Sequence, residues 1–298
     1  MSNLPKQVKI VDVSPRDGLQ NEKQVIDLAT KLELIERLGQ SGVKNIEITG
    51  FVSPKWVPQL ADSSQLCERL THHKNINYSA LVPNLKGMEL AITGGMEEVA
   101  VFTAASESFT HKNINCSIDE SLERFKPVML LARENNIKVR GYVSCVLGCP
   151  YEGEIRSSKV AEVTEKLFKL GCYEVSLGDT IGTGTPLKAQ KMLKRCMEIA
   201  SINTLALHFH NTYGQALANI YACLELGAHI VDASVAGLGG CPYAKGASGN
   251  VATEDVVYML DGMGIETGID LQKLIQTGQW ISQKLNKSNN SHVGKAHT

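Results

Sequence analysis

The sequence lacks a long apolar run and lacks an excess of charge of either sign. No stretch approaches the roughly 20 apolar residues of a membrane-spanning helix, and the N-terminus MSNLPKQVKI has no apolar run behind a basic stretch. The formal net charge of -1 gives no electrostatic reason to expect nucleic acid as a partner. We therefore expect a soluble, cytoplasmic protein that binds neither membranes nor nucleic acid.

The cysteines lack the density of a disulfide scaffold and the grouping of a zinc site. Cys145 and Cys149 lie close in sequence, but no second cysteine pair and no nearby histidine would complete a zinc site. Most cysteines fall in apolar contexts, which favours reduced residues packed in the core. The 298-residue chain carries eight, at positions 67, 116, 145, 149, 172, 196, 223 and 241.

Short β-rich runs alternate with amphipathic helical stretches along most of the chain. The runs expected to be strands are Val8–Val13, Asn45–Thr49, Asn77–Val82, Glu98–Phe102, Lys138–Ser144, Glu174–Leu177, Thr204–Phe209 and His229–Ser234. Helices expected between them include Val25–Leu38, Ser117–Asn135, Ser157–Leu170, Pro186–Ile199 and Gln215–Leu226. This alternation predicts parallel strands, and eight units in about 250 residues indicate a closed (β/α)8 TIM barrel.

An open doubly wound sheet is the less favoured fold, because its glycine fingerprint is missing. The cluster GDTIGTG at Gly178–Gly184 follows a late strand and is more simply a strand-to-helix loop. After the eighth strand comes a glycine-rich loop, Gly237–Gly249, and then helices are expected at Thr253–Gly262 and Asp270–Leu285.

No linker or low-complexity block divides the chain, so we expect one TIM-barrel catalytic domain over residues 1–298. The barrel should occupy about residues 8–250 and the C-terminal helical extension about residues 251–285. The polar tail, residues 286–298, is expected to be disordered.

Polar residues at the C-terminal ends of barrel strands are the first candidates for an active site. His208 and His210 lie on one face of a strand, because side chains alternate along it. Such a pair alone is more often a hydrogen-bonded core pair. Barrel closure would bring Asp17 beside it, and a carboxylate with two imidazoles is a credible Mg²⁺ or Mn²⁺ site. Asn250, after the eighth strand, could add an amide oxygen.

Two further residues suggest chemistry at this end of the barrel. Arg16 keeps its charge and could stabilise an enolate or carboxylate oxygen. It could also pair with Glu47 or Asp179, and both interpretations can hold together. Cys241 follows the glycine-rich sequence GLGG, so its thiol could reach substrate as a general acid or base. A purely structural loop cysteine is the alternative.

Several long motifs together resemble the 3-hydroxy-3-methylglutaryl-CoA lyase family, in its bacterial form, over about residues 8–285. They are far more specific than the R-D-G and H-x-H elements, which recur in related metal-dependent lyases and synthases. The motifs are SPRDGLQNE at Ser14–Glu22, FVSPKWVPQ at Phe51–Gln59, GYVSCVLGCPYEG at Gly141–Gly153, SLGDTIG at Ser176–Gly182, HFHNTYGQALAN at His208–Asn219 and VAGLGGCPYAKGASGN at Val235–Asn250.

The resemblance implies metal-dependent cleavage of 3-hydroxy-3-methylglutaryl-CoA to acetoacetate and acetyl-CoA. The implied ligands of a divalent cation, Mg²⁺ or Mn²⁺, are Asp17, His208, His210 and Asn250. The implied catalytic residues are Arg16 for the enolate, Cys241 for proton transfer, and Glu47 and Asp179 for orientation or proton relay.

The resemblance also implies contacts to coenzyme A, a homodimer, and a role in leucine catabolism and ketone-body formation. The candidates for contacting coenzyme A are Lys23, Lys112, Asn113 and Arg140, each of which could equally be a solvated surface residue. Two other functions stay open. One is a condensing acyl-CoA synthase of the isopropylmalate or homocitrate type, and the other is a non-catalytic barrel that binds a metal or an acyl-CoA.

Overall fold

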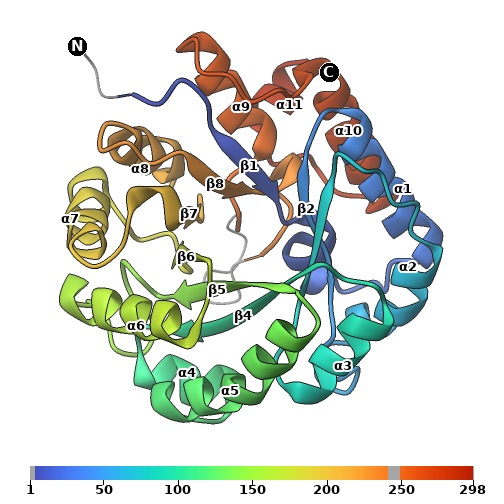
Figure 1. Cartoon of the computed structure of the whole chain (residues 1–298). Coiled ribbons are helices and arrows are strands. Elements are labelled where there is room, and N and C mark those ends of the chain that lie inside the picture. Colours follow the sequence, from blue (N-terminus) through green and yellow to red (C-terminus); the bar gives the residue numbers. More distant parts are fainter. Residues whose placement is uncertain (1–3, 241–248, 298) are drawn as a thin grey trace.

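Eight parallel strands pair in chain order and close into a barrel, because β1 pairs with both β2 and β8 (Figure 1). The computed structural model describes residues 4–240 and 249–297. The (β/α)8 prediction is confirmed, and each predicted strand is present. The strands are β1 (Lys9–Asp12), β2 (Asn45–Gly50), β3 (Asn77–Leu81), β4 (Glu98–Ala104), β5 (Lys138–Ser144), β6 (Glu174–Asp179), β7 (Leu205–Phe209) and β8 (Ile230–Ala233).

Helices form a ring around the strands in Figure 1, as the alternating pattern predicts. No helix of the described residues is both long and apolar enough to span a membrane. The helices are α1 (Leu28–Gln40), α2 (Ser63–Arg69), α3 (Leu85–Thr93), α4 (Glu107–Ile114), α5 (Ile118–Glu134), α6 (Ser157–Leu170), α7 (Pro186–Met197), α8 (Ala216–Leu224), α9 (Thr253–Gly262), α10 (Leu271–Lys284) and α11 (His292–Ala296).

The helix α5 illustrates why these segments are helical. Ser117 caps its first turn by accepting from the backbone amide of Glu120, whose carboxylate accepts from the Ser117 amide. Its buried face repeats Leu122, Phe125 and Met129 at helical spacing. The main apolar core lies between such helix faces and the strands. The seven cysteines within the described residues are buried free thiols, as the sequence predicts.

The interior of the barrel contains buried charges where most TIM barrels carry branched apolar side chains. Arg140 on β5 donates to Glu174 on β6 and, through two nitrogens, to Asp232 on β8. All three side chains are at most 4% exposed. A buried charge is costly without a partner. Because the partners here come from different strands, these ion pairs link β5 to β6 and to β8.

The C-terminal tail is ordered over the described residues, so the prediction of disorder from residue 286 is wrong there. Residues His292–Ala296 form α11, and the carboxylate of Asp255 on α9 accepts from the backbone amides of His292 and Val293. The Ser291 hydroxyl donates to the same carboxylate at 2.6 Å. The polar composition of the tail suggested disorder. In the fold, however, the buried Asp255 carboxylate accepts hydrogen bonds from the hydroxyl and amide groups at the start of α11.

Candidate active site

A tight turn immediately after β1 carries the first two candidate residues, Arg16 and Asp17. The Val13 carbonyl accepts from the backbone amides of both Asp17 and Gly18, which produces a π-helical turn over Ser14–Gly18. A Cβ atom on Gly18 would lie 2.8 Å from the Ser234 hydroxyl oxygen. The turn therefore packs against the chain after β8 at a distance that only glycine permits.

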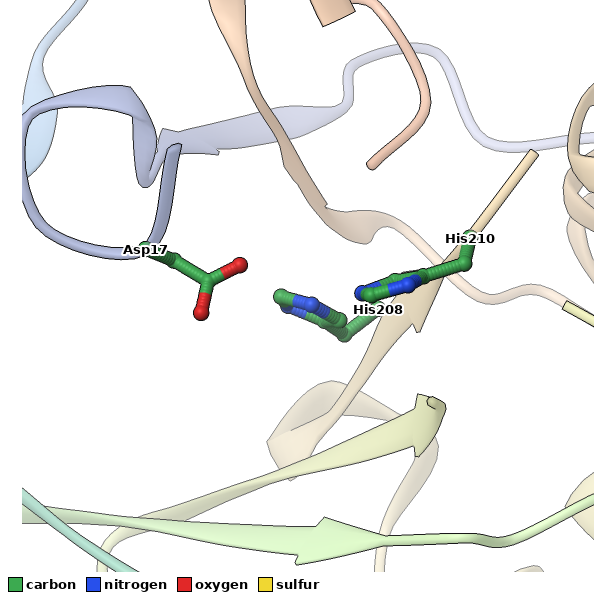
Figure 2. A group of neighbouring side chains, drawn as sticks. All are labelled: Asp17, His208 and His210. Carbon is green, nitrogen blue, oxygen red and sulfur yellow. The ribbon is translucent and has the colours of Figure 1, made fainter. Parts of the chain in front are cut away.

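His208 on β7 (Leu205–Phe209) and His210, which immediately follows that strand, lie opposite this turn. The two positions follow the alternation of strand side chains, and each is only 8% exposed. Their ring centroids are 5.4 Å apart, and Figure 2 shows the Asp17 carboxylate facing both rings. An isolated antiparallel bridge pairs His210 with Asn250, which brings Asn250 to the same place. Barrel closure thus assembles all four predicted metal ligands.

The donor set fits a divalent cation. One ligand atom from each of Asp17, His208 and His210 lies within 4.8 Å of the others. The His210 Nδ1 atom is buried and has no hydrogen-bond partner among the described residues. Asn250 donates from its amide nitrogen to Asp17 at 2.7 Å. Mixed oxygen and imidazole donors are compatible with Mg²⁺ or Mn²⁺, although geometry and availability decide between metals.

Buried charges control protonation in this cluster. Burial raises the pKa of Asp17, but Arg16 and the two histidines outweigh burial and lower that pKa to about 2. Burial, reinforced by His208, lowers the pKa of His210 to about 4. At neutral pH Asp17 is therefore a carboxylate and His210 a neutral imidazole, the forms that ligate metals.

Arg16 lies between two carboxylates. Its Nη1 atom contacts Asp17 at 2.8 Å, and its Nε atom donates to buried Glu47 on β2. The predicted ion pair with Glu47 is thus present, and the guanidinium remains beside the metal-ligand cluster. Tyr142 on β5 donates its hydroxyl to the other Glu47 oxygen at 2.8 Å. Glu47 therefore holds Arg16 in position.

Asp179 ends β6 as a fully buried carboxyl group. One of its oxygens accepts from the Gly184 amide at 2.8 Å, while the other has no hydrogen-bond partner among the described residues. Burial raises the pKa of Asp179 to about 6, against the lowering by the amides of its loop. This group can therefore gain or lose a proton close to neutral pH.

The residues predicted to contact coenzyme A, apart from Arg140, lie at the surface. Lys23, Lys112 and Asn113 are exposed, and the Lys112 ammonium lies 5.9 Å from the centroid of the Tyr151 ring. Cys241 falls outside the described residues, so the structure gives it no position.

The prediction that Arg140 contacts coenzyme A is wrong. Its guanidinium is buried inside the barrel, where it binds Glu174, Asp232 and the Tyr142 hydroxyl. It therefore has no exposed group to offer to the phosphates of coenzyme A. The sequence pattern could not show this, because a strand arginine looks the same whether its partners lie in solvent or across the barrel.

Two residues at the site were missed by the sequence analysis, Tyr142 and Asp232. Asp232 is buried on β8 and lies 3.2 Å from the Nδ1 atom of His208. Its signal was a single acid within the otherwise apolar strand IVDA. Buried acids in strands are uncommon unless they are paired, so this pattern could have indicated an interior partner.

Comparison with known proteins identifies the family. The family model described as HMGL-like matches residues 7–281. The mitochondrial hydroxymethylglutaryl-CoA lyase of Gallus gallus is 58% identical over 293 residues, which cover 98% of each chain. The chain belongs to the hydroxymethylglutaryl-CoA lyase family. The resemblance carried by the sequence motifs is thereby confirmed.

Solved structures of hydroxymethylglutaryl-CoA lyases share this fold closely. The enzyme of Pseudomonas aeruginosa matches with a TM-score of 0.97 and 55% identity, over 99% of this chain and 98% of that one. A lyase of Acinetobacter baumannii, solved in complex with coenzyme A and 3-methylmalate, matches with a TM-score of 0.93 and 37% identity. That match covers 98% of this chain and 95% of the other.

Proposed function

We propose that this chain is a metal-dependent carbon-carbon lyase that cleaves 3-hydroxy-3-methylglutaryl-CoA to acetoacetate and acetyl-CoA. The observation that carries the proposal is the cluster of Asp17, His208 and His210 at the C-terminal end of the barrel, with the Arg16 guanidinium on the same carboxylate. Membership of the hydroxymethylglutaryl-CoA lyase family supports this substrate over those of related barrels.

The metal we propose is Mg²⁺ or Mn²⁺, held by Asp17, His208, His210 and Asn250. The partnerless Nδ1 atom of His210 and the ionised state of Asp17 support this assignment. Asn250 would contribute its amide oxygen, which requires the amide to turn from its present donor orientation toward Asp17. A cation bound here supplies a Lewis acid, which lowers the pKa of a coordinated hydroxyl group.

The reaction breaks the bond between C2 and C3 of the substrate. The C3 hydroxyl loses its proton and becomes the ketone of acetoacetate, while the electron pair of the broken bond leaves as the enolate of acetyl-CoA. We assign Arg16 to the enolate oxygen, because its charge is permanent and Glu47 holds it beside the cluster. The enolate then takes up one proton.

Proton transfer is assigned to two groups. Asp179 is buried with one partnerless oxygen and a pKa near 6, so it can relay a proton at neutral pH. Cys241 is the proposed donor to the enolate carbon, and this assignment is supported by its motif after the glycine-rich segment. Its loop lies outside the described residues.

Recognition of coenzyme A is proposed for Lys23, Lys112 and Asn113. All three are exposed, and two of them are cations that can meet phosphate groups. The Acinetobacter baumannii neighbour was solved with coenzyme A, which supports a site for this ligand on the shared fold. We also propose a homodimer, a cytoplasmic location, and a role in leucine catabolism and ketone-body formation.

Direct product analysis tests the function. Purified full-length chain with Mg²⁺ or Mn²⁺ should release acetoacetate from 3-hydroxy-3-methylglutaryl-CoA, and a chelator should abolish the release. His210→Ala should lose activity, whereas His73→Ala, which changes an exposed histidine outside the cluster, should keep it.

Three outcomes would contradict the lyase assignment. Wild-type chain that forms no acetoacetate with either metal would contradict it outright. Release of free thiol from acetyl-CoA mixed with 2-oxo acids, without acetoacetate formation, would indicate a condensing synthase. Metal binding without turnover of any acyl-CoA would indicate a non-catalytic binding barrel.

A further inference from the structure

We propose that Asp232 is a positioning residue for the metal site. Its buried carboxylate fixes the imidazole of His208 with Nδ1 protonated, so that Nε2 is the atom presented toward Asp17 and a metal. This inference rests on the proposed divalent-cation site.

The carboxylate of Asp232 is itself buried and held by several hydrogen bonds. It is 2% exposed, and Arg140 contacts both of its oxygens, at 2.7 and 3.0 Å. The Ser176 hydroxyl donates to Oδ2 at 2.8 Å. A carboxylate paired in this bidentate way with a guanidinium is ionised and can only accept hydrogen bonds.

The geometry at His208 follows from this. Its Nδ1 atom lies 3.2 Å from Asp232 Oδ2, which can only accept, so Nδ1 must carry the proton. Nε2 then keeps its lone pair in the neutral ring, the form that a metal requires. Carboxylates that hold ligand histidines in this way tune both ring orientation and basicity.

The two histidines differ in this respect. Nδ1 of His210 has no hydrogen-bond partner among the described residues. The His208 ring is thus fixed before a metal binds, whereas no hydrogen bond within the described residues holds Nδ1 of His210. We therefore expect the Asp232 carboxylate to contribute to metal affinity chiefly through His208.

Asp232 also connects the histidine side of the site to the aspartate side. Arg140 donates to the Tyr142 hydroxyl at 2.8 Å, and that hydroxyl donates to Glu47 at 2.8 Å. Glu47 in turn holds Arg16, which contacts Asp17. A continuous buried network therefore braces His208 and Asp17 from opposite sides of the cluster, which limits the rearrangement needed to bind a cation.

Direct metal titration tests the proposal, with Mn²⁺ as the probe and electron paramagnetic resonance as the readout. Full-length Asp232→Asn is expected to bind Mn²⁺ about 10 to 100-fold more weakly than the wild type. Glu174→Gln is the matched control, because Glu174 binds the same Arg140 but is not among the contacts of His208. The Mn²⁺ affinity of Glu174→Gln should stay within about threefold of that of the wild type. This is expected because the proposal attributes the loss of affinity to His208 and not to a general loss of charge from the network.

Three results would overturn the proposal. The first is Mn²⁺ affinity of Asp232→Asn within about threefold of the wild type. The second is an equal loss in the Asp232→Asn and Glu174→Gln variants, which would indicate a general structural role. The third comes from the wild type alone, so it applies even if Asp232→Asn fails to fold: ¹⁵N NMR of the Mg²⁺-saturated chain should show His208 protonated at Nδ1, and a proton on Nε2 would overturn the idea.

These readouts need no substrate. Wild-type chain that binds Mn²⁺ but forms no acetoacetate would contradict the proposed function and leave the role of Asp232 intact. A wild type that forms acetoacetate, together with an Asp232→Asn variant of unchanged Mn²⁺ affinity, would support the proposed function and contradict the role of Asp232.

Discussion

Arg16 combines two roles that are usually separate. It neutralises the buried carboxylate of Glu47 and also contacts Asp17, a proposed metal ligand. Burial alone would lower the pKa of its guanidinium, but Glu47 and Asp17 raise it above its usual range. Because the charge is permanent, the group can meet a developing enolate without a proton-transfer step.

Replacing Arg16 by glutamine should therefore reduce turnover strongly. We expect Arg16→Gln to lose about 3 kcal/mol of transition-state stabilisation, which is more than a hundredfold in kcat. Buried Glu47 would lose one partner but keep Tyr142, so unfolding should become easier by about 1 to 3 kcal/mol without loss of the fold. Steady-state kinetics with thermal unfolding measures both, and Arg37→Gln, which changes a partly exposed arginine of α1 paired with Glu33, is the control. Near-normal kcat in Arg16→Gln would remove the assigned role.

Cys241 provides a second test at this scale. We expect Cys241→Ala to lose rate while Mn²⁺ affinity and KM stay close to those of the wild type, because the thiol is assigned to proton transfer and not to ligation. Cys223→Ala, at a buried cysteine of α8, controls for the loss of any thiol. Unchanged kcat in Cys241→Ala would make this residue a structural loop cysteine.

At the level of the elements, the strands and the turns after them carry the site, and the C-terminal helices pack beside the segment that follows β8. The tail reaches back to the segment after β8, since the Asn290 amide donates to the Ala236 carbonyl. Ala236 and Gly237 there have φ values of 57° and 59°, an uncommon conformation for alanine. The segment that leads into α11 therefore docks against Ala236, where the glycine-rich loop begins.

The contact most suited to testing this docking is the carboxylate of Asp255. It accepts from the Ser291 hydroxyl and from two backbone amides at the start of α11. Asp255→Asn should lower the free energy of unfolding by about 1 to 3 kcal/mol, because it weakens several hydrogen bonds at a buried position. Chemical denaturation measures the change, and Asp270→Asn, at the exposed cap of α10, should cost less. Equal costs would show that α11 adds no special stability.

At the scale of the whole molecule, burial gives the stability an unusual dependence on pH. Glu254 is fully buried at the start of α9, and both of its oxygens lie within hydrogen-bond distance of the Ala236 amide. Burial raises the pKa of Glu254 to about 8, and neighbouring Asp255 and Asp12 add to the effect. Between pH 4.5 and about 8 the folded chain therefore keeps a proton that the unfolded chain has lost.

The sign of the effect follows from this proton. The contribution of Glu254 to the free energy of unfolding is most favourable below pH 4.5 and falls as the pH rises toward about 8. Glu254→Gln should remove this contribution, so the variant should gain stability relative to the wild type between about pH 5 and pH 8. Urea unfolding of both proteins across that range measures the difference. A constant difference between them would contradict the raised pKa.

The sequence by itself determined the local structure and the types of reactive group. The short β-rich runs between amphipathic helical stretches predicted all eight strands, and Lys138–Ser144 matches the structure at both ends. Strand alternation placed His208 and His210 on one face, because that rule depends only on neighbouring residues. The long motifs gave the family, which the comparisons confirm.

Only the tertiary structure decided which distant groups meet. Barrel closure brought Asp17 to the two histidines. It also paired Arg140 with Asp232, 92 residues apart in the chain, so a residue expected to contact coenzyme A forms an ion pair inside the barrel. The same holds for the tail. Its polar composition suggested disorder, but in the fold the Ser291 hydroxyl donates to the buried Asp255 carboxylate. Partners far apart in sequence leave no periodic signal, because their contacts exist only after the chain has closed on itself.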